Sequence, residues 1–357
     1  MELAFELSRE HETLPKSEVF ACLHALSVSY VEKVFSDGIL VVDTQLSHEA
    51  LDTLSRRLGM THCIYEVKGC SKPEEREILA VVKNADIDNF MEQGLTFAVR
   101  VKAKSNFISE EKKLLERDLE RKAGEIIRWK GYKVNLTNPS KTFVLLITKQ
   151  TCFFCLLLHA ADKKQFGERK PHLRPFFSPG VIKPKIARAL VNLSSIKEGG
   201  IFLDPFCGTG GILIEAGLIG ATLVGIDMQA KMVRGAEKNL RIYELKANLI
   251  VGDSSKMALR DNSVDAVVTD LPYGRSSLVS RSGYFLAESR TRFLERLHRD
   301  ALNEVHRVLK TRGRAVIVSN SSSLYSFSHE FHFRVLENHK YRVHKSLSRY
   351  IAILEKE

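Results

Sequence analysis

The residues best suited to chemistry stand in the pentapeptide Asp270-Leu271-Pro272-Tyr273-Gly274. It follows an apolar run at residues 264–269, which predicts a buried strand that ends at Asp270. An amino group on a flat ring is a poor nucleophile because its lone pair is delocalised, and two hydrogen-bond acceptors can draw it towards tetrahedral geometry. The Asp270 carboxylate and the Leu271 carbonyl are such acceptors, and Tyr273 can stack on a flat substrate. We therefore predict Asp270, Leu271, Pro272 and Tyr273 as catalytic residues; the alternative is a structural turn capped by Asp270.

A glycine-rich loop lies upstream, between a predicted strand at residues 201–204 and a predicted helix at residues 211–218. A strand, a tight glycine turn and a helix bring backbone N–H groups close to a nucleotide. Such a loop alone also fits NAD, FAD or no ligand, but its glycine spacing is not that of the dinucleotide fingerprint. The cofactor-binding residues predicted here are Asp204, Pro205, Phe206, Cys207, Gly208, Thr209, Gly210 and Gly211.

Two further acidic residues follow the next two predicted strands, at residues 222–227 and 248–251. Asp227, followed by Met228, can accept both hydroxyls of a ribose, and Asp253, followed by Ser254, would lie near an adenine edge. Asp204 can face a cationic amino acid group. Each carboxylate taken singly fits a strand-end cap, but three at successive strand ends, with Asp270 beside them, predict S-adenosylmethionine as the cofactor.

The elements that must position these residues alternate regularly after residue 199. Strands are expected at residues 201–204, 222–227, 248–251, 264–270 and 314–318, with helices at residues 211–218, 228–243 and 291–309 between them. Strands separated by crossover helices predict a parallel, doubly wound sheet. The residue pattern at 341–354 predicts an antiparallel hairpin at the edge of this sheet.

The first half has a different pattern, typical of a small α+β module. Strands are expected at residues 19–23, 39–43, 62–67, 97–102, 133–136 and 142–148, and a helix at residues 48–58. A second helix, at residues 110–128, has an apolar face at Leu115, Leu119, Ala123 and Ile127 and an opposite basic face. The predicted RNA-binding residues are Lys112, Lys113, Arg117, Arg121 and Arg128, together with Arg275 after the pentapeptide.

The charge distribution supports a polyanionic partner. Residues 1–96 hold 9 Lys and Arg against 17 Asp and Glu, whereas residues 97–175 hold 18 against 8 and residues 176–357 hold 27 against 18. Clustered cations neutralise phosphates, so RNA is the expected partner, although an ordinary solvated basic face fits the charge alone equally well.

Composition excludes several other classes of protein. With 44% hydrophobic and 27% charged residues the chain is neither disordered nor collagen-like. The first ten residues do not resemble a signal peptide, and the apolar stretch at residues 143–161 is interrupted by Lys149 and Gln150, which predicts two buried strands or a strand and a helix. We expect a cytoplasmic protein with six free cysteines, and no histidine or cysteine spacing predicts a metal site.

The motifs D-P-F-C-G-T-G-G, G-I-D, G-D and D-L-P-Y-G together resemble the Rossmann-fold amino-methyltransferases. The usual tetrapeptide of that family has Pro where this chain has Leu271, a difference that leaves the main-chain carbonyl in place. The basic helix and the segment at residues 134–139 resemble a THUMP RNA-binding domain. The segment at residues 169–180, which includes Ser178, is similar to the linker that closes over the cofactor in that family.

Over most of its length, about residues 60–357, the chain resembles the archaeal tRNA guanosine-10 methyltransferases. The resemblance implies an α/β protein with a ferredoxin-like α+β region (residues 1–60), a THUMP domain (61–160), a linker (161–185) and a class I Rossmann-fold methyltransferase domain with a mostly parallel seven-stranded sheet (186–357). It implies mono- or dimethylation of the 2-amino group of guanosine 10 in tRNA. It also suggests a small zinc-binding activator protein as a partner, and hence a monomer or a heterodimer.

Two alternatives remain open at this point. One keeps the chemistry but moves it to guanosine 6 of tRNA or to a ribosomal RNA guanine. The other is an RNA-binding protein whose methyltransferase domain is catalytically inert.

Overall fold

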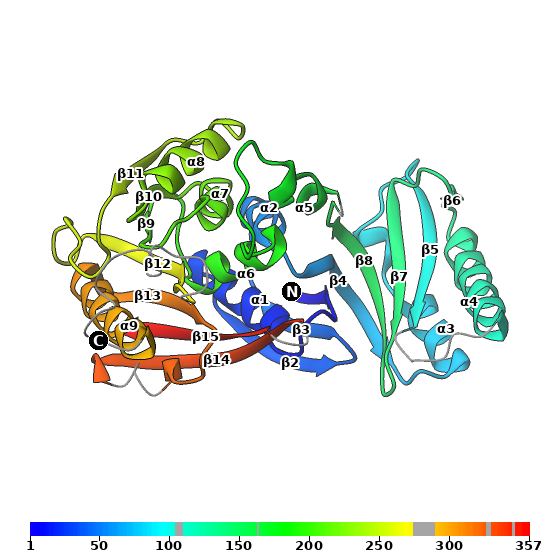
Figure 1. The fold of residues 1–357 in the computed structure, drawn as a ribbon. Coiled ribbons are helices and arrows are strands. Elements are labelled where there is room, and N and C mark those ends of the chain that lie inside the picture. Colours follow the sequence, from blue (N-terminus) through cyan, green and yellow to red (C-terminus); the bar gives the residue numbers. More distant parts are fainter. Residues whose placement is uncertain (104–109, 163, 274–289, 326–329, 345–346) are drawn as a thin grey trace. The chain divides into compact units, whose positions relative to one another are not determined.

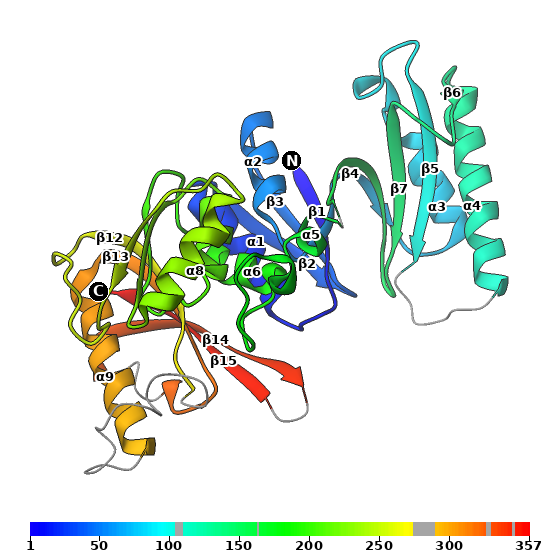
Figure 2. The same cartoon turned by 45° about the horizontal axis from the view of Figure 1, so that its top comes forward.

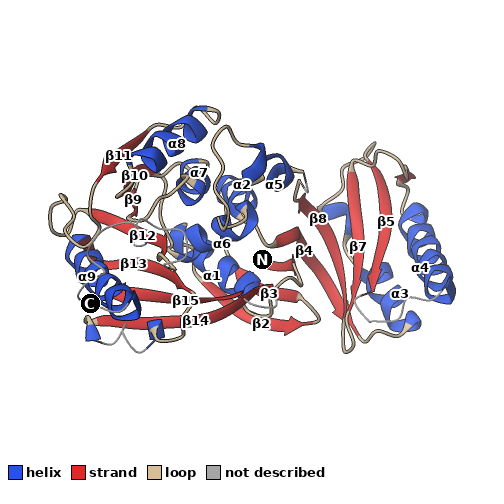
Figure 3. Cartoon of the chain, viewed as in Figure 1, coloured by secondary structure: helices blue, strands red, loops and turns tan. Residues whose placement is uncertain are grey.

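The computed structural model describes the chain except residues 104–109, 163, 274–289, 326–329 and 345–346, and it describes no side chains for residues 110–114, 290 and 291. The chain divides into two compact units (Figures 1 and 3). The first unit comprises Met1–Glu10, Val28–Ser55 and Thr61–Ala161, and the second comprises His11–Ser27, Arg56–Met60 and Asp162–Glu357.

The first unit is built on an eight-stranded sheet with the order β2-β3-β1-β4-β8-β7-β5-β6. Its strands are β1 (Glu2–Leu7), β2 (Tyr30–Ser36), β3 (Ile39–Thr44), β4 (Thr61–Ser71), β5 (Thr96–Ala103), β6 (Lys133–Val134), β7 (Lys141–Ile147) and β8 (Cys152–Ala160). The helices that come between these strands in the sequence are α1 (Leu14–Ala25), which is part of the second unit, α2 (His48–Arg57), α3 (Glu75–Asn84), the short η1 (Ile87–Asn89) and α4 (Glu110–Trp129).

The N-terminal part of this sheet has the expected ferredoxin-like connectivity. Strands and helices follow one another as β1-α1-β2-β3-α2-β4, and the four strands lie in the order β2-β3-β1-β4. The long strand β4 pairs with β1 through Leu3 and Glu66 and with β8 through Val67 and Cys155. It therefore belongs both to the ferredoxin-like strands and to the second half of the sheet.

Helices α3 and α4 cover one face of the second half of the sheet. Leu119, Ala123 and Ile127 of α4 are buried against Phe97 and Phe143 of the strands, as the apolar spacing predicts. Leu115, assigned to the same apolar face, is instead 69% exposed. That part of the prediction was wrong, because helical spacing identifies a face but not how far the sheet beneath it extends.

The second unit is built on a seven-stranded sheet with the order β11-β10-β9-β12-β13-β15-β14. Its strands are β9 (Ile201–Asp204), β10 (Thr222–Asp227), β11 (Ala247–Val251), β12 (Val264–Asp270), β13 (Leu309–Ser319), β14 (Phe333–His344) and β15 (Leu347–Lys356). Its helices include α5 (Gln165–Glu168), the short η2 (Pro171–Leu173), α6 (Pro184–Leu193), α7 (Gly211–Gly217), α8 (Ala230–Arg241) and α9 (Arg290–Val308).

The first five strands of this order are parallel, and β15 and β14 add an antiparallel hairpin at the edge, as predicted (Figure 2). Successive side chains along each strand point to opposite faces of the sheet, where they pack into two separate apolar layers. Phe202 and Val316 pack towards α6 and α7, whereas Leu203 and Ile317 pack towards α9. Helices on both faces make the sheet doubly wound.

Helix α1 belongs to this second unit, and it corrects a prediction, because residues 19–23 were expected to form a strand. Its apolar residues are buried on several sides, so they form a continuous run, which a sequence pattern cannot distinguish from a buried strand. Glu18 of α1 accepts hydrogen bonds from the backbone N–H groups of Gly59 and Met60 and from Asn192 of α6. These bonds attach α1 to the segment just before β4 and to helix α6.

The apolar stretch at residues 143–161 forms the two buried strands β7 and β8. Within the part of the chain that the structure describes, no helix has the length and apolarity needed to cross a membrane. The six cysteines are unpaired thiols, and Cys152 and Cys155 are both buried in the sheet.

Candidate active site

The glycine-rich loop joins β9 to α7, and its conformation requires glycine at two positions. Gly208 and Gly210 have φ values of +51° and +76°, in the left-handed region that other residues adopt at a cost. A Cβ on Gly210 would also lie 3.2 Å from the Cβ of Ala236 on α8. The Cys207 N–H donates to the Ile226 carbonyl at 2.9 Å, which ties the loop to the neighbouring strand β10.

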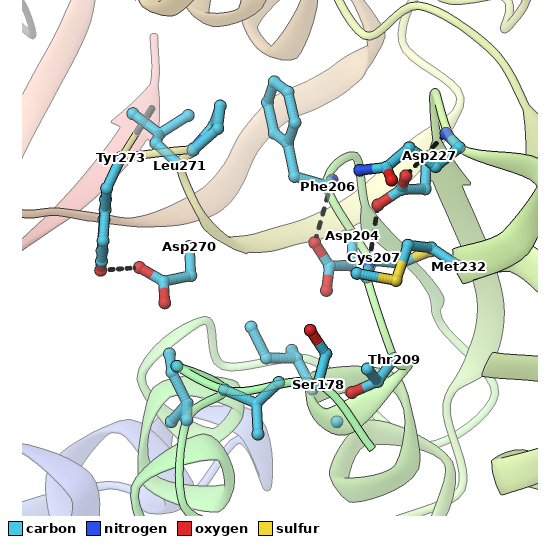
Figure 4. A pocket seen from close by; sticks show the side chains of 18 of the residues that line it. Ser178, Asp204, Phe206, Cys207, Thr209, Asp227, Met232, Asp270, Leu271 and Tyr273 are labelled. Atoms are coloured by element: carbon cyan, nitrogen blue, oxygen red, sulfur yellow. Dashed lines mark hydrogen bonds between the residues drawn. The ribbon is translucent and has the colours of Figure 1, made fainter. Parts of the chain in front are cut away.

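Four carboxylates lie at the carboxyl ends of four neighbouring strands. Asp204, Asp227 and Asp270 end β9, β10 and β12, and Asp253 lies two residues beyond β11. All four line one cavity of about 500 Å³. Figure 4 shows Asp204, Asp227 and Asp270 along its wall, with Ser178 on the opposite side. The four carboxylates thus lie together at the edge where open parallel sheets bind ligands, and their binding of a cofactor stays a prediction.

Asp204 is the most deeply buried of the four, with 1% of its surface exposed. Its Oδ1 accepts hydrogen bonds from the Thr269 hydroxyl at 2.8 Å and from the Phe206 N–H at 3.2 Å. Burial raises the pKa of Asp204 to about 7, and the negative charges of Asp227 and Asp270 add to the rise. A cationic group entering the cavity would therefore be attracted to this carboxylate and would favour its ionised form.

Asp227 organises the loop around it. Its Oδ2 accepts from the Gly208 N–H at 3.0 Å and its Oδ1 from the Gln229 N–H at 2.8 Å. Burial raises its pKa, and these two backbone bonds oppose the rise. Each carboxylate oxygen retains a further lone pair for a ligand hydroxyl.

The β11 end of the cavity is formed by Asp253 and Ser254. Asp253 accepts hydrogen bonds from the N–H and the hydroxyl of Ser255, at 2.9 and 2.8 Å. The buried Ser254 hydroxyl donates to the carbonyl of Pro205, which links this strand end to the glycine-rich loop.

The backbone of the predicted catalytic tetrapeptide is held from both sides. The Leu271 N–H donates to the Val318 carbonyl of β13 at 2.9 Å. The Nε2 atom of His298, on α9, lies 3.1 Å from the Pro272 carbonyl, which accepts its hydrogen bond. The loop after β12 is thus fixed to a strand and to a helix that are adjacent in space.

The side chains of Asp270 and Tyr273 face one another in the cavity (Figure 4). The Tyr273 hydroxyl donates to Oδ1 of Asp270, and Arg349 donates to Oδ2 at 3.1 Å. Burial raises the pKa of Asp270, whereas the charge of Arg349 and the Tyr273 hydrogen bond lower it. Tyr273 points into the cavity and not into the protein interior.

The segment before α6 closes another side of the cavity, and one buried side chain anchors it. Asn239 of α8 accepts from the Phe176 N–H at 3.0 Å and donates to the carbonyls of Phe176 at 2.8 Å and Thr209 at 2.9 Å. The segment that contains Ser178 is thereby bonded to the glycine-rich loop. The ring of Phe176 packs directly on Gly235 of α8, where a Cβ would lie only 2.0 Å from it.

We therefore expect Gly235→Ala to displace Phe176 and loosen this segment. Overpacking of this kind costs about 1–3 kcal/mol of unfolding free energy, and we expect cofactor affinity to fall roughly tenfold. Thermal melting and titration calorimetry measure both effects. Gly167→Ala in α5 is the matched control, because nothing lies within 4 Å of its added Cβ, and it should not lower the melting temperature. Unchanged cofactor affinity in Gly235→Ala would contradict the anchoring role of this contact.

Most of the predicted cofactor-binding residues line the same cavity. Those that do are Ser178, Asp204, Phe206, Cys207, Gly208, Thr209, Gly211, Asp227, Met228, Asp253, Ser254 and Asp270. Pro205 and Gly210 do not line it and instead shape the loop from behind. The tetrapeptide residues Asp270, Leu271, Pro272 and Tyr273 all line it.

The predicted RNA-binding residues of α4 are only partly described. Arg117, Arg121 and Arg128 are exposed, and Arg121 pairs within the helix with Asp118 and Glu125, both at 2.9 Å. The side chains of Lys112 and Lys113, and Arg275 altogether, lie outside the described residues.

Sequence reasoning missed three side chains that hold the site together: Arg349, Asn239 and His298. Each reaches the site from an element distant in sequence, and no local motif marks any of them. A buried arginine or asparagine becomes visible only when the strand or helix that carries it is placed beside the site.

The cavity lining favours a cationic nucleotide-like ligand. Among the described lining residues there are four aspartates and no Lys or Arg. A dinucleotide with an anionic pyrophosphate would meet this negative potential unfavourably, whereas S-adenosylmethionine carries a sulfonium and an ammonium group. Asp204 and Asp227 offer carboxylates for cations and hydroxyls, and Met232 and Ile212 offer apolar contacts. The residues present therefore fit S-adenosylmethionine.

Comparison with known proteins agrees with this geometry. The family model described as RMKL-like, methyltransferase domain matches residues 171–351, and the THUMP domain model matches residues 72–157. The tRNA (guanine(10)-N2)-dimethyltransferase of Methanothermobacter thermautotrophicus is 33% identical over 358 residues, which cover all of both chains. That of Pyrococcus abyssi is 34% identical and covers 89% of this chain and 90% of its own.

More distant relatives share the fold. The human tRNA (guanine(10)-N(2))-methyltransferase is 25% identical over 66% of this chain and 58% of its own length. The crystal structure of TrmN from Thermus thermophilus has a TM-score of 0.54 and 17% identity, with full coverage of both chains. The crystal structure of SMU.472 complexed with SAH has a TM-score of 0.54 and 16% identity, and the match covers 100% of this chain and 98% of that one.

Proposed function

The chain belongs to the THUMP-containing methyltransferase family of the archaeal tRNA (guanine(10)-N2)-dimethyltransferases, and we propose that it methylates the 2-amino group of guanosine 10 in tRNA. The methyl donor is S-adenosylmethionine. One observation carries the proposal: four strand-end carboxylates and the 270–273 loop line one cavity without a Lys or Arg among its described lining residues. A cation and a hydrogen-bonding amine both suit such a cavity.

The strand-end carboxylates would hold the donor in an extended position along the sheet edge. S-adenosylmethionine supplies an electrophilic methyl group on a cationic sulfur. Asp204 would face its charged amino acid part, Asp227 its ribose hydroxyls and Asp253 its adenine edge. The buried position of Asp204 strengthens its attraction for a cation because little water screens the charge.

The 270–273 loop would hold the target base. The Asp270 carboxylate and the Leu271 carbonyl would accept the two amino hydrogens, and Tyr273 would stack on the ring. The donor would supply its methyl group to the amino nitrogen, the electron pair of the carbon–sulfur bond would stay on sulfur, and the Asp270 carboxylate would accept the proton that the nitrogen loses. Pro272 limits the conformations of the loop, and Leu271 offers its carbonyl as the usual proline would.

We propose further that two methyl groups are added in succession. The support is the dimethyltransferase name of the full-length relatives. The monomethylated amine keeps one hydrogen, so it needs only one of the two acceptors, and the other can face the first methyl group.

The exposed cations of α4 in the first unit would contribute to tRNA binding. Arg117 and Arg128 are exposed, whereas part of the charge of Arg121 is neutralised by its two intrahelical ion pairs. Phosphate neutralisation by such residues gives sequence-independent affinity. Because tRNA is the proposed substrate, the cytoplasm is the proposed location of the protein.

The zinc-binding activator protein is proposed to dock at the β11 edge of the second sheet. Among the described strands β11 pairs with β10 alone, and none of its five residues is fully buried. Val251, on this strand, is 53% exposed, and Ile242, just after α8, is 52% exposed. An added strand could pair with this edge and cover both apolar side chains. The chain would be a monomer without it.

The test is methylation of unmodified tRNA transcripts with labelled S-adenosylmethionine, followed by mass spectrometry of nuclease fragments. We expect two methyl groups on guanosine 10, and none in a transcript with adenosine at that position. Label at guanosine 6, label only in ribosomal RNA, or no label despite donor and tRNA binding would each overturn the proposal. The last outcome would identify an RNA-binding protein with an inert domain.

A further inference from the structure

Arg349 is a buried arginine whose strand brings it to the catalytic edge of the sheet. Only 4% of its surface is exposed. It lies on β15, next to Tyr350, which is opposite Ser319 of β13. The preceding residue of β13, Val318, is opposite Asp270 of β12. Arg349 is therefore two strands away from Asp270 at the same end of the sheet.

The guanidinium bonds to three groups on two different segments. Its Nη2 donates to the Gly180 carbonyl at 2.8 Å and to Oδ2 of Asp270 at 3.1 Å, and its Nε donates to the Tyr273 hydroxyl at 3.1 Å. Tyr273 in turn donates to the other oxygen of Asp270. A planar fork of donors makes all of these bonds at once, whereas a lysine ammonium has a single donor centre.

The ion pair between Arg349 and Asp270 matters because a second carboxylate lies nearby. Asp270 lies in a buried site with a second carboxylate, Asp204, close enough for the charges to interact. Among the residues that the structure describes, Arg349 is the cation that forms an ion pair with Asp270. The titratable groups around the Asp270 loop are Asp204 from β9, Tyr273 from the loop itself, His298 from α9, His344 from β14 and Arg349 from β15.

We propose that Arg349 is a positioning residue for methyl transfer. Its hydrogen bond to Asp270 keeps that carboxylate ionised and fixes its orientation. Its bonds to the Tyr273 hydroxyl and to the Gly180 carbonyl fix the Tyr273 side chain beside Asp270 and hold the segment around Gly180 against the cavity. The inference rests on the proposed function, because it assumes that Asp270 accepts a hydrogen bond from the target amine. Without Arg349 the same carboxyl would tend to take up a proton, and a protonated carboxyl is a poorer acceptor.

The test compares Arg349→Gln and Arg349→Lys with wild type in single-turnover methylation of tRNA from pH 6 to 9. Arg241→Gln is the matched control, because Arg241 forms an exposed ion pair with Glu237. The wild-type rate should fall on the acid side as Asp270 is protonated. In Arg349→Gln this acid limb should move about 1–3 pH units higher, the effect of removing a nearby opposite charge. Arg241→Gln should match wild type.

Arg349→Lys separates charge from geometry. It keeps the positive charge, so its acid limb should stay near the wild-type position, while its rate falls because the bonds to Tyr273 and Gly180 are lost. If Arg349→Gln does not fold, the hydrogen exchange of Arg349→Lys at the segment that contains Gly180 is the test instead. A merely structural role for Arg349 would lower the rate of Arg349→Gln by the same factor at every pH and leave its acid limb in the wild-type position, and that result would overturn the proposal.

Hydrogen exchange provides a readout that is independent of activity. The backbone of residues 176–183 should exchange faster in both Arg349 variants than in wild type or Arg241→Gln, since the bond to Gly180 is lost or weakened. Unchanged exchange together with an unmoved acid limb would refute the inference. If Asp270→Asn retained full activity, the role of Asp270 in the proposed function would fail instead, so the two failures can be told apart.

Discussion

Asp270→Asn is expected to lower the single-turnover rate of tRNA methylation by ~100-fold or more, since one well-placed polar group in a buried site has this effect. The amide retains the shape of the carboxylate but loses its charge and presents a donor on one side. Arg349, buried beside it, would also lose its ionic partner. Rapid-quench measurement at saturating donor and tRNA gives the rate, and calorimetry should show both affinities within a few-fold of wild type.

Asp265→Asn is the matched control for this change. Asp265 lies on the same strand, β12, but at its opposite end, where it accepts from the Ile201 N–H at 2.8 Å and pairs with Lys310 at 2.7 Å. Its replacement should lower stability and leave the single-turnover rate unaffected. A near-normal rate in Asp270→Asn would remove Asp270 from the catalytic machinery.

Asp204→Asn is expected to weaken cofactor binding by roughly 10- to 100-fold at pH 8, the range for loss of a charge-assisted hydrogen bond. In wild type the affinity itself should depend on pH. With a pKa of about 7, Asp204 is mostly ionised at pH 8 and mostly protonated at pH 6. Because a cationic ligand favours the carboxylate, affinity should fall by up to about tenfold per pH unit below 7. Calorimetry in buffers of different ionisation enthalpy should detect proton release on binding.

The stability of the cofactor-free protein should move in the opposite direction. The pKa of Asp204 is raised in the folded state, so the folded state binds its proton more tightly than the unfolded state does. The stability this contributes is present at low pH and is lost as pH rises through about 7. Asp204→Asn should therefore melt at a higher temperature than wild type at pH 8. Cofactor affinity that is equal at pH 6 and pH 8 in wild type would refute the assignment to Asp204.

Much of the site could be predicted from sequence because its parts obey local rules. The strands at residues 201–204, 222–227 and 264–270 match β9, β10 and β12, and each has an aspartate at its end. In a parallel sheet those ends meet at one edge, so local periodicity was enough to bring Asp204, Asp227 and Asp270 together. The glycines of the loop are likewise a local requirement, set by positive φ values at Gly208 and Gly210.

The parts that could not be predicted depend on contacts between distant segments. Residues 19–23 were expected to be a strand and are part of α1, because their neighbours in the fold, and not their own spacing, make them helical and buried. Leu115 has the spacing of a core residue and is exposed.

The sequence by itself determined the chemistry at the strand ends, because backbone periodicity and glycine conformation act over a few residues. The tertiary structure alone decided which side chains support that chemistry. Arg349, His298 and Asn239 bond to residues that line the cavity, and they come within reach of them only through the register of β15 against β13 and the packing of α9 and α8. Such placements are set by long-range packing, in which residues tens to hundreds of positions apart become neighbours.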